Sequence, residues 1–197
     1  MLLKINGQPV DVTLENEKSV GDVLKSFESE AAKNDATTVA IRLNGKDISA
    51  EQFDAAAATP LSDSTEIDLH VVSKRDIVDS FKTIAAEFNR LTEQLNDVPV
   101  QLQSGKDKEA SETIASLATE VDAFCHTAAL SALFPDLYNA LIIDGKNLND
   151  FFKEFSPILS DFESAMEVKD TVTVGDLSEY EIGPRLKSIS EVLTKFN

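Results

Sequence analysis

The sequence FFKEFSPILSDFESAMEVKDTVTVGDLSEYEIGPRLKSISEVL, residues 151–193, sets the pattern of the C-terminal part of the chain. Its apolar residues recur at steps of three and four, which is typical of one face of a helix. The pattern begins at Leu148, three residues before the quoted stretch. It continues through Phe152, Phe155, Leu159, Phe162 and Met166. A kink or a join between two helices is expected at Pro157, because proline removes a helical hydrogen-bond donor. Leu186, Ile189 and Leu193 predict a last helix.

Two earlier segments carry the same spacing. The first contains Ile77, Phe81, Ile84, Phe88, Leu91 and Leu95, and the second contains Ile114, Leu117, Val121, Phe124 and Ala128. Breaks are expected at Pro99 and Pro135. Three or four antiparallel helices with short loops between them predict a helical bundle over residues 74–197.

The first 73 residues have a different pattern, with short alternating apolar runs that predict strands. Strands are expected at residues 2–5, 10–14, 38–43, 46–48 and 66–72, with tight turns at Asn6-Gly7 and Asn44-Gly45. A helix is expected to begin after Ser19, which forms a capping pattern with Asp22. A short second helix is expected over residues 49–58, ended by Pro60.

This order of elements, closed by LSDSTEIDLHVV, resembles the ubiquitin-like β-grasp fold. The resemblance implies an α+β protein with a β-grasp domain at residues 1–73, followed by the antiparallel helical bundle at residues 74–197. Ubiquitin-like modifiers and sulfur carriers of this fold end in a free Gly-Gly tail. Here the closing strand runs on into a helix, so conjugation and sulfur transfer are not expected.

The chain is acidic, with 35 Asp and Glu against 18 Lys and Arg and a net charge of −17. This charge argues against a nucleic acid or an anionic membrane as partner, because both would be repelled. A single cysteine, Cys125, no signal peptide and no apolar run of membrane-spanning length favour a cytoplasmic protein. Acidity is spread along the whole chain, so charge by itself does not mark a site.

The candidate binding residues lie in the stretch quoted first. On a continuous helix Glu163, Glu167 and Asp170 would share one face, which could bind a cation or a basic peptide. Pro184 leaves the carbonyl of Tyr180 without its helical donor, so a polar pocket or a docking notch could form there. The simpler interpretation is a solvated face and a structural kink. The residues assigned to partner binding are Glu163, Glu167, Asp170, Asp176, Glu179, Tyr180 and Glu181.

No catalytic, cofactor or metal site is expected. Cys125 and His126 are adjacent and would point about 100° apart on a helix, which does not suit a nucleophile and its base. The spacing of the two histidines and one cysteine does not suit a zinc site. No phosphate-binding loop or hydrolase motif is present.

The function expected from these features is that of a non-catalytic, acidic adaptor or scaffold, bacterial in character. Its partner would be a protein, either basic or carrying an amphipathic helix. One alternative is an export or assembly chaperone for a secreted or filament subunit. Another is a metal-dependent enzyme using Glu163, Glu167 and Asp170. A helical seam left unfilled within the chain would also allow a homodimer.

Overall fold

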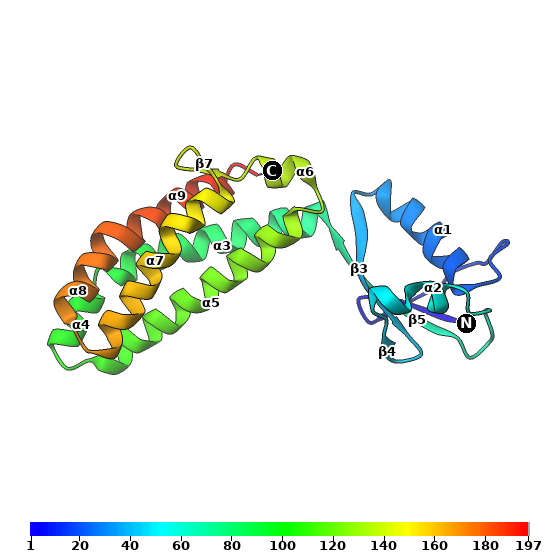
Figure 1. The fold of residues 1–197 in the computed structure, drawn as a ribbon, viewed down its shortest axis with the longest axis horizontal. Helices are drawn as coiled ribbons and strands as arrows, with labels where there is room; N and C mark the ends of the chain where they lie inside the picture. The colour runs from blue at the N-terminus through cyan, green and yellow to red at the C-terminus, as the bar shows by residue number, and fades with distance from the viewer. Residues whose placement is uncertain (197) are drawn as a thin grey trace. The chain divides into compact units, whose positions relative to one another are not determined.

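The computed structural model describes residues 1–196 and divides the chain into two units, Met1–Asp76 and the residues from Ile77 onward. The first unit holds a five-stranded sheet, and the second is helical apart from one small hairpin. The predicted α+β composition, with an N-terminal sheet and a C-terminal helical region, is therefore confirmed (Figure 1).

The sheet of the first unit has the strand order β2-β1-β5-β3-β4. The central strands β1 and β5 pair in parallel, and the other neighbours pair antiparallel. The strands are β1 (Leu2–Ile5), β2 (Gln8–Val10), β3 (Ala36–Leu43), β4 (Lys46–Asp47) and β5 (Glu66–Ser73). The helical elements of this unit are α1 (Val20–Ala32), η1 (Ala50–Gln52) and α2 (Phe53–Ala57).

Local sequence signals explain most of these elements. Asn44 and Gly45 have positive φ angles of 49° and 78°, as a two-residue hairpin turn requires. The predicted capping box at the start of α1 is present: the Ser19 hydroxyl accepts from the Asp22 N–H, and the Asp22 carboxylate accepts from the Ser19 N–H. The core of the unit consists of Leu3, Val20, Val23, Leu43, Ile67 and Leu69.

The second strand lies earlier in the chain than predicted, since of the expected residues 10–14 only Val10 belongs to β2 (Gln8–Val10). β2 ends at Val10, and the side chains of Val12 and Leu14 are 45% and 40% exposed. The register pairs Leu3 with Val10, and β1 begins at Leu2. Val12 and Leu14 therefore lie opposite no residue of β1, and their alternation does not produce a strand.

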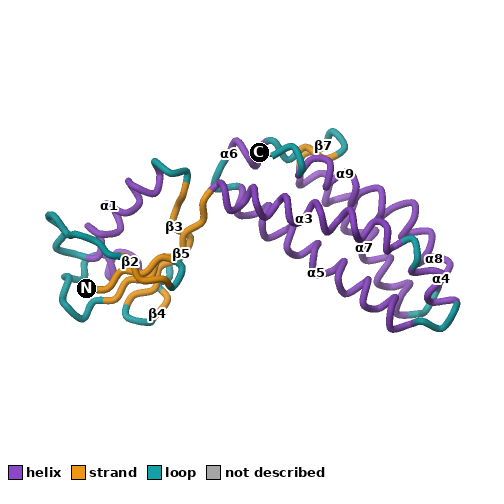
Figure 2. Tube along the Cα trace, turned by 180° about the vertical axis from the view of Figure 1, so that it is seen from behind, coloured by secondary structure: helices purple, strands orange, loops and turns teal. Residues whose placement is uncertain are grey.

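The long helices of the second unit run side by side (Figures 1 and 2). The helical elements are α3 (Lys74–Leu95), α4 (Val98–Gln103), α5 (Asp107–Ser131), α6 (Pro135–Asn139), α7 (Leu148–Glu167), α8 (Thr171–Asp176), the π-helix η2 (Leu177–Ile182) and α9 (Gly183–Leu193). The hairpin β6 (Ile142–Ile143) and β7 (Lys146–Asn147), which was not predicted, turns at Asp144 and Gly145.

The apolar stripe predicted for α3 is confirmed, since all six of its residues are buried. The stripe of α7 is divided instead. Phe155 and Phe162 are buried, but Phe152, Leu159 and Met166 are only half-buried. The join between two helices that was one expectation at Pro157 is not found within residues 148–167: α7 runs through this exposed proline from Leu148 to Glu167.

The helix that carries Pro184 contains a π turn. Gly183 donates its N–H to the carbonyl of Ser178, five residues earlier, as in a π-helix. α8, η2 and α9 follow one another without a loop. The wider turn directly precedes Pro184, the second residue of α9, which has no N–H to donate within the helical run.

Candidate functional site

The structure separates the three carboxylates that were expected on one helix face. Glu163 and Glu167 are exposed on α7, one turn apart. Lys169 takes a positive φ of 57° just after the end of α7, so Asp170 does not continue that face. The Asp170 carboxylate caps α8, accepting from the N–H and the hydroxyl of Thr173 at 3.1 and 2.7 Å. These bonds hold the pKa of Asp170 below its ordinary value. The prediction of one shared face is therefore wrong for Asp170.

The other predicted residues lie along η2 and its ends. Tyr180 is 64% exposed, and a hydrogen bond to Glu179, together with the charges of Glu179 and Asp176, raises the pKa of its hydroxyl. Arg185 Nη1 donates to both the carbonyl and the carboxylate of Glu181, at 2.9 and 2.6 Å. The Arg185 guanidinium therefore supplies a hydrogen-bond donor to the Glu181 carbonyl and neutralises the charge of the Glu181 carboxylate.

A groove of about 520 Å³ lies between α5 and α7. Leu117 and Phe162 are its buried floor, and half-buried aliphatic side chains line its walls. The lining residues are Ile114, Leu117, Ala118, Val121, Asp122, Cys125, Leu159, Phe162, Glu163, Met166 and Glu167. Glu163 and Glu167 are therefore the two predicted residues that the structure brings to a concave surface.

Aromatic side chains of α5 and α7 pack against each other beside this groove. The rings of Phe124 and Phe152 stack with their centroids 5.9 Å apart, and Phe124 also meets Phe88 of α3 edge-on at 5.9 Å. Farther along the two helices Ile114, Val121, Leu159 and Met166 stay half-buried. Their three-and-four spacing predicted core positions, but part of this apolar surface faces the groove.

The charges of the groove are all of one sign. Asp122 lies on the α5 side and Glu163 and Glu167 on the α7 side, and no lysine or arginine lines the groove. Within residues 1–196 these three carboxylates have neither an ion pair nor a hydrogen bond. Burial, and then the charge of Asp122, raise the pKa of Cys125. This shift favours the protonated thiol over the thiolate, although Cys125 is exposed.

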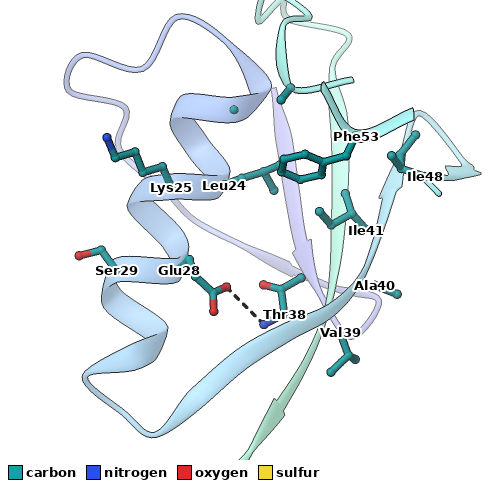
Figure 3. A pocket seen from close by; sticks show the side chains of 12 residues that line it. Leu24, Lys25, Glu28, Ser29, Thr38, Val39, Ala40, Ile41, Ile48 and Phe53 are labelled. Carbon is teal, nitrogen blue, oxygen red and sulfur yellow. Dashed lines mark hydrogen bonds between the residues drawn. The ribbon is translucent and has the colours of Figure 1, made fainter. Parts of the chain in front are cut away.

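A second groove, of about 760 Å³, lies in the first unit between α1, β3 and α2 (Figure 3). Its apolar lining includes Leu24, Ile41, Ile48 and Phe53. The Phe53 ring lies across it, with 42% of the residue exposed.

Within residues 1–196 the outer edge of β3 along this groove has no strand partner before Ile41, because β4 pairs with Arg42 and Leu43 and the Ile48 N–H donates to the Ile41 carbonyl. Glu28 of α1 covers part of that edge (Figure 3). Its carboxylate accepts from the Thr37 hydroxyl at 2.6 Å and the Thr38 N–H at 3.3 Å. A bulge at Val39 further interrupts the edge. Both devices hinder the addition of another strand.

In the part of the chain that the structure describes, no group of three or more His, Cys, Asp or Glu side chains is placed to hold a metal ion. The alternative that uses Glu163, Glu167 and Asp170 as metal ligands needs all three side chains together. The end of α7 before Asp170 removes that arrangement. Cys125 and His126 are both exposed on α5, one residue apart.

Residues 79–192 match the family model of a domain of unknown function, DUF8042, and residues 1–73 match the TP0873 N-terminal domain. The chain belongs to the DUF8042 family. A Treponema pallidum (strain Nichols) protein described as uncharacterized is 30% identical over 191 residues, which cover 97% of this chain and 95% of that protein. No solved structure matched. Both walls of the α5–α7 groove lie within the DUF8042 match.

Across residues 1–196, no helix of this DUF8042 protein combines the length and the apolar character needed to cross a bilayer.

Proposed function

We propose that this protein is a non-catalytic, cytoplasmic adaptor or scaffold that binds an amphipathic helix of a protein partner in the α5–α7 groove. The observation that carries the proposal is the half-buried apolar surface on facing helices. Ile114 and Val121 on α5, with Leu159 and Met166 on α7, border the buried floor of Leu117 and Phe162. A groove of this kind suits a helix whose apolar residues recur at steps of three and four.

The energetics favour occupation of the groove. Fully burying one aliphatic side chain contributes about 1.5–3 kcal/mol relative to leaving it exposed. Four half-buried side chains retain part of this gain for a partner to realise. The Phe124–Phe152 contact joins α5 and α7 beside the groove, and a surface that is held in place before binding has a lower ordering cost.

We also propose that the first unit is a ubiquitin-like β-grasp domain. The strand order β2-β1-β5-β3-β4, the parallel central pair and the single long helix α1 support this assignment. This assignment concerns only the fold of the first unit, because a fold does not by itself imply a function. The proposed binding function rests on the groove of the second unit.

An export or assembly chaperone would use the same groove, because its client would also present an amphipathic helix. The adaptor and the chaperone differ in the fate of the bound helix, which a chaperone hands on. Displacement of the bound helix by a second client subunit would favour the chaperone.

The test is binding of a synthetic helix to the full chain. The probe is a fluorescent peptide of about 18 residues, with leucines at i, i+3, i+4 and i+7 and glutamines elsewhere, so that it carries an apolar stripe and little charge. Fluorescence anisotropy should show saturable binding. Val121→Glu, which puts a charge on the groove wall, should weaken binding at least about tenfold.

The matched control is Val172→Glu, because Val172 is 67% exposed on α8 and does not line the groove. This variant should bind like the unmodified protein. Leu159→Ala provides a milder change, expected to weaken binding several-fold. Circular dichroism checks that each variant is folded. Absence of saturable binding, or equal binding by the Val121→Glu and Val172→Glu variants, would overturn the proposal.

A further inference from the structure

The α5–α7 groove combines an apolar floor with a negatively charged rim. Carboxylates stand on both of its sides, Asp122 on α5 and Glu163 with Glu167 on α7. Two other carboxylates of α7, those of Asp150 and Glu154, are neutralised locally by lysines. Asp150, for example, accepts from Lys153 at 2.7 Å.

The three groove carboxylates have no such cation. No lysine or arginine is among the residues that line the groove, and within the described chain none lies within ion-pairing distance of Asp122, Glu163 or Glu167. Their charges are therefore available to a ligand. They also repel one another when the groove is empty, since like charges one helical turn apart are unfavourable.

Resting on the function proposed above, we propose that the partner helix is basic as well as amphipathic. Lysine or arginine side chains flank its apolar stripe on both sides. On one side two of them are spaced i and i+4, to face Glu163 and Glu167, and on the other side one faces Asp122. The occupant is thus a cationic amphipathic helix of a protein.

The geometry sets this pattern. Glu163 and Glu167 are four residues apart on α7, about 6 Å along its axis, which equals the spacing of two residues at i and i+4 on a helix beside it. Long basic side chains can lay their aliphatic stems along the apolar wall while their charged ends reach the rim. Val121, Leu159 and Met166 offer that wall.

The same charges disfavour a second copy of this chain as the occupant. The protein carries a net charge of −17, so two copies repel each other at long range. The acidic rim of the groove would have no favourable electrostatic interaction with the acidic surface of a second copy. A basic helix is attracted by both the rim and the overall field.

The experiment compares three peptides of about 18 residues on the full chain, all with the same leucine stripe. The flanking positions carry lysine, glutamine or glutamate. Each exposed ion pair strengthens an interaction by about 1.5- to 5-fold. The lysine peptide should therefore bind about tenfold more tightly than the glutamine peptide. This advantage should shrink as NaCl rises from about 50 to 300 mM, because salt screens exposed charges.

The net charge alone would attract any cationic peptide, so the decisive comparison uses two triple variants of equal charge. Asp122→Asn, Glu163→Gln and Glu167→Gln together remove the groove charges. Asp144→Asn, Glu93→Gln and Glu191→Gln remove three exposed charges that do not line the groove. The advantage of the lysine peptide should fall to about twofold or less in the first variant and persist in the second.

The outcomes separate this inference from the proposed function. Equal binding of the lysine and glutamine peptides would overturn the inference and leave the helix-binding function standing. An equal loss in both triple variants would also overturn it, since the attraction would then come from net charge. Binding of none of the peptides would overturn the proposed function itself. Formation of a dimer by the free protein, measured by light scattering and abolished by Val121→Glu, would assign the groove to a second copy and overturn both.

Discussion

The hydroxyl of Ser190 on α9 donates a 3.0 Å hydrogen bond to the backbone carbonyl of Ala85 on α3, across 105 positions of the chain. Both residues are almost completely buried, each with 1% of its surface exposed. The bond joins the first and last long helices of the second unit.

Replacement of Ser190 by alanine should lower the free energy of unfolding by about 1 kcal/mol, because a buried hydrogen bond is lost and a small gap is left. Ser190→Val should cost more, since it also forces extra volume into a closely packed contact. Urea denaturation followed by circular dichroism measures both. Ser164→Ala, at an exposed serine that bonds only within its own helix, is the control and should be nearly neutral.

Gly183→Ala should destabilise the protein, although a glycine-to-alanine change inside a helix ordinarily stabilises it by about 0.5–1 kcal/mol. A Cβ atom at Gly183 would lie 3.0 Å from the Ser178 carbonyl oxygen, the acceptor of the π-type bond. Because that neighbour is backbone, it cannot move away cheaply, and a loss of about 1–2 kcal/mol is expected. Lys187→Ala, exposed on the same helix, should leave the thermal midpoint almost unchanged. A raised midpoint for Gly183→Ala would contradict the π geometry.

Glu28→Ala should uncover the outer edge of β3. The Thr37 hydroxyl and the Thr38 N–H would lose their acceptor, at a cost of about 1 kcal/mol. An unpaired strand edge promotes association between chains, so the variant should self-associate at concentrations where the unmodified protein does not. Sedimentation velocity measures this. Glu30→Ala removes a carboxylate that makes only an exposed ion pair with Lys33 and should stay unassociated.

Asp22 links stability to pH. Its carboxylate accepts from the Lys18 N–H, the Ser19 hydroxyl and the Ser19 N–H, each at 2.9 Å, and these bonds hold its pKa below the usual 3.8. A lowered folded-state pKa contributes stability that is present above pH 3.8 and is lost as the pH falls through the folded-state value.

Asp22→Asn should therefore lower the thermal midpoint near neutral pH, and the difference from the unmodified protein should close towards about pH 2. Thermal denaturation across this pH range gives the measurement. Asp63→Asn, at an exposed side chain, should follow the unmodified protein throughout. A constant difference for Asp22→Asn from neutral to acid pH would show that the ionised cap is not the source of the effect.

Local chemistry made much of the fold predictable. The Asn44-Gly45 turn, the Ser19–Asp22 capping box and the α3 stripe each depend on residues within a few positions of one another. The strand order of the sheet depends on long-range pairing, and so does the groove beside β3. Neither can be read from periodicity alone.

The α5–α7 groove could be predicted only in part, for a similar reason. Spacing shows which way a side chain points along a helix, but it does not show how closely the next helix approaches. Val121 and Leu159 therefore had the spacing of core residues and proved half-buried. The end of α7 was missed because Lys169, with a side chain that seldom adopts a positive φ, makes the turn there.

The spacing of buried residues around η2 accounts for the π turn. Val174, Ser178, Ile182 and Leu186 are all buried and follow one another at steps of four. In a regular α-helix each such step advances about 40° around the axis, so three steps would carry the last residue about 120° away from the first. A helix that keeps all four inside must be locally wider.

The number of residues between Val174 and Leu186 therefore carries structural information of its own. Removing one residue from Leu177–Ile182 would allow ordinary helical hydrogen bonding and would place Leu186 eleven residues after Val174, about 20° away from it around a regular α-helix. Leu186, Ile189 and Leu193 would therefore stay in the core, and Ser190 would stay beside Ala85. The loss of one residue should be tolerated better here than in a regular helix such as α3, where it would turn everything after it by about 100°.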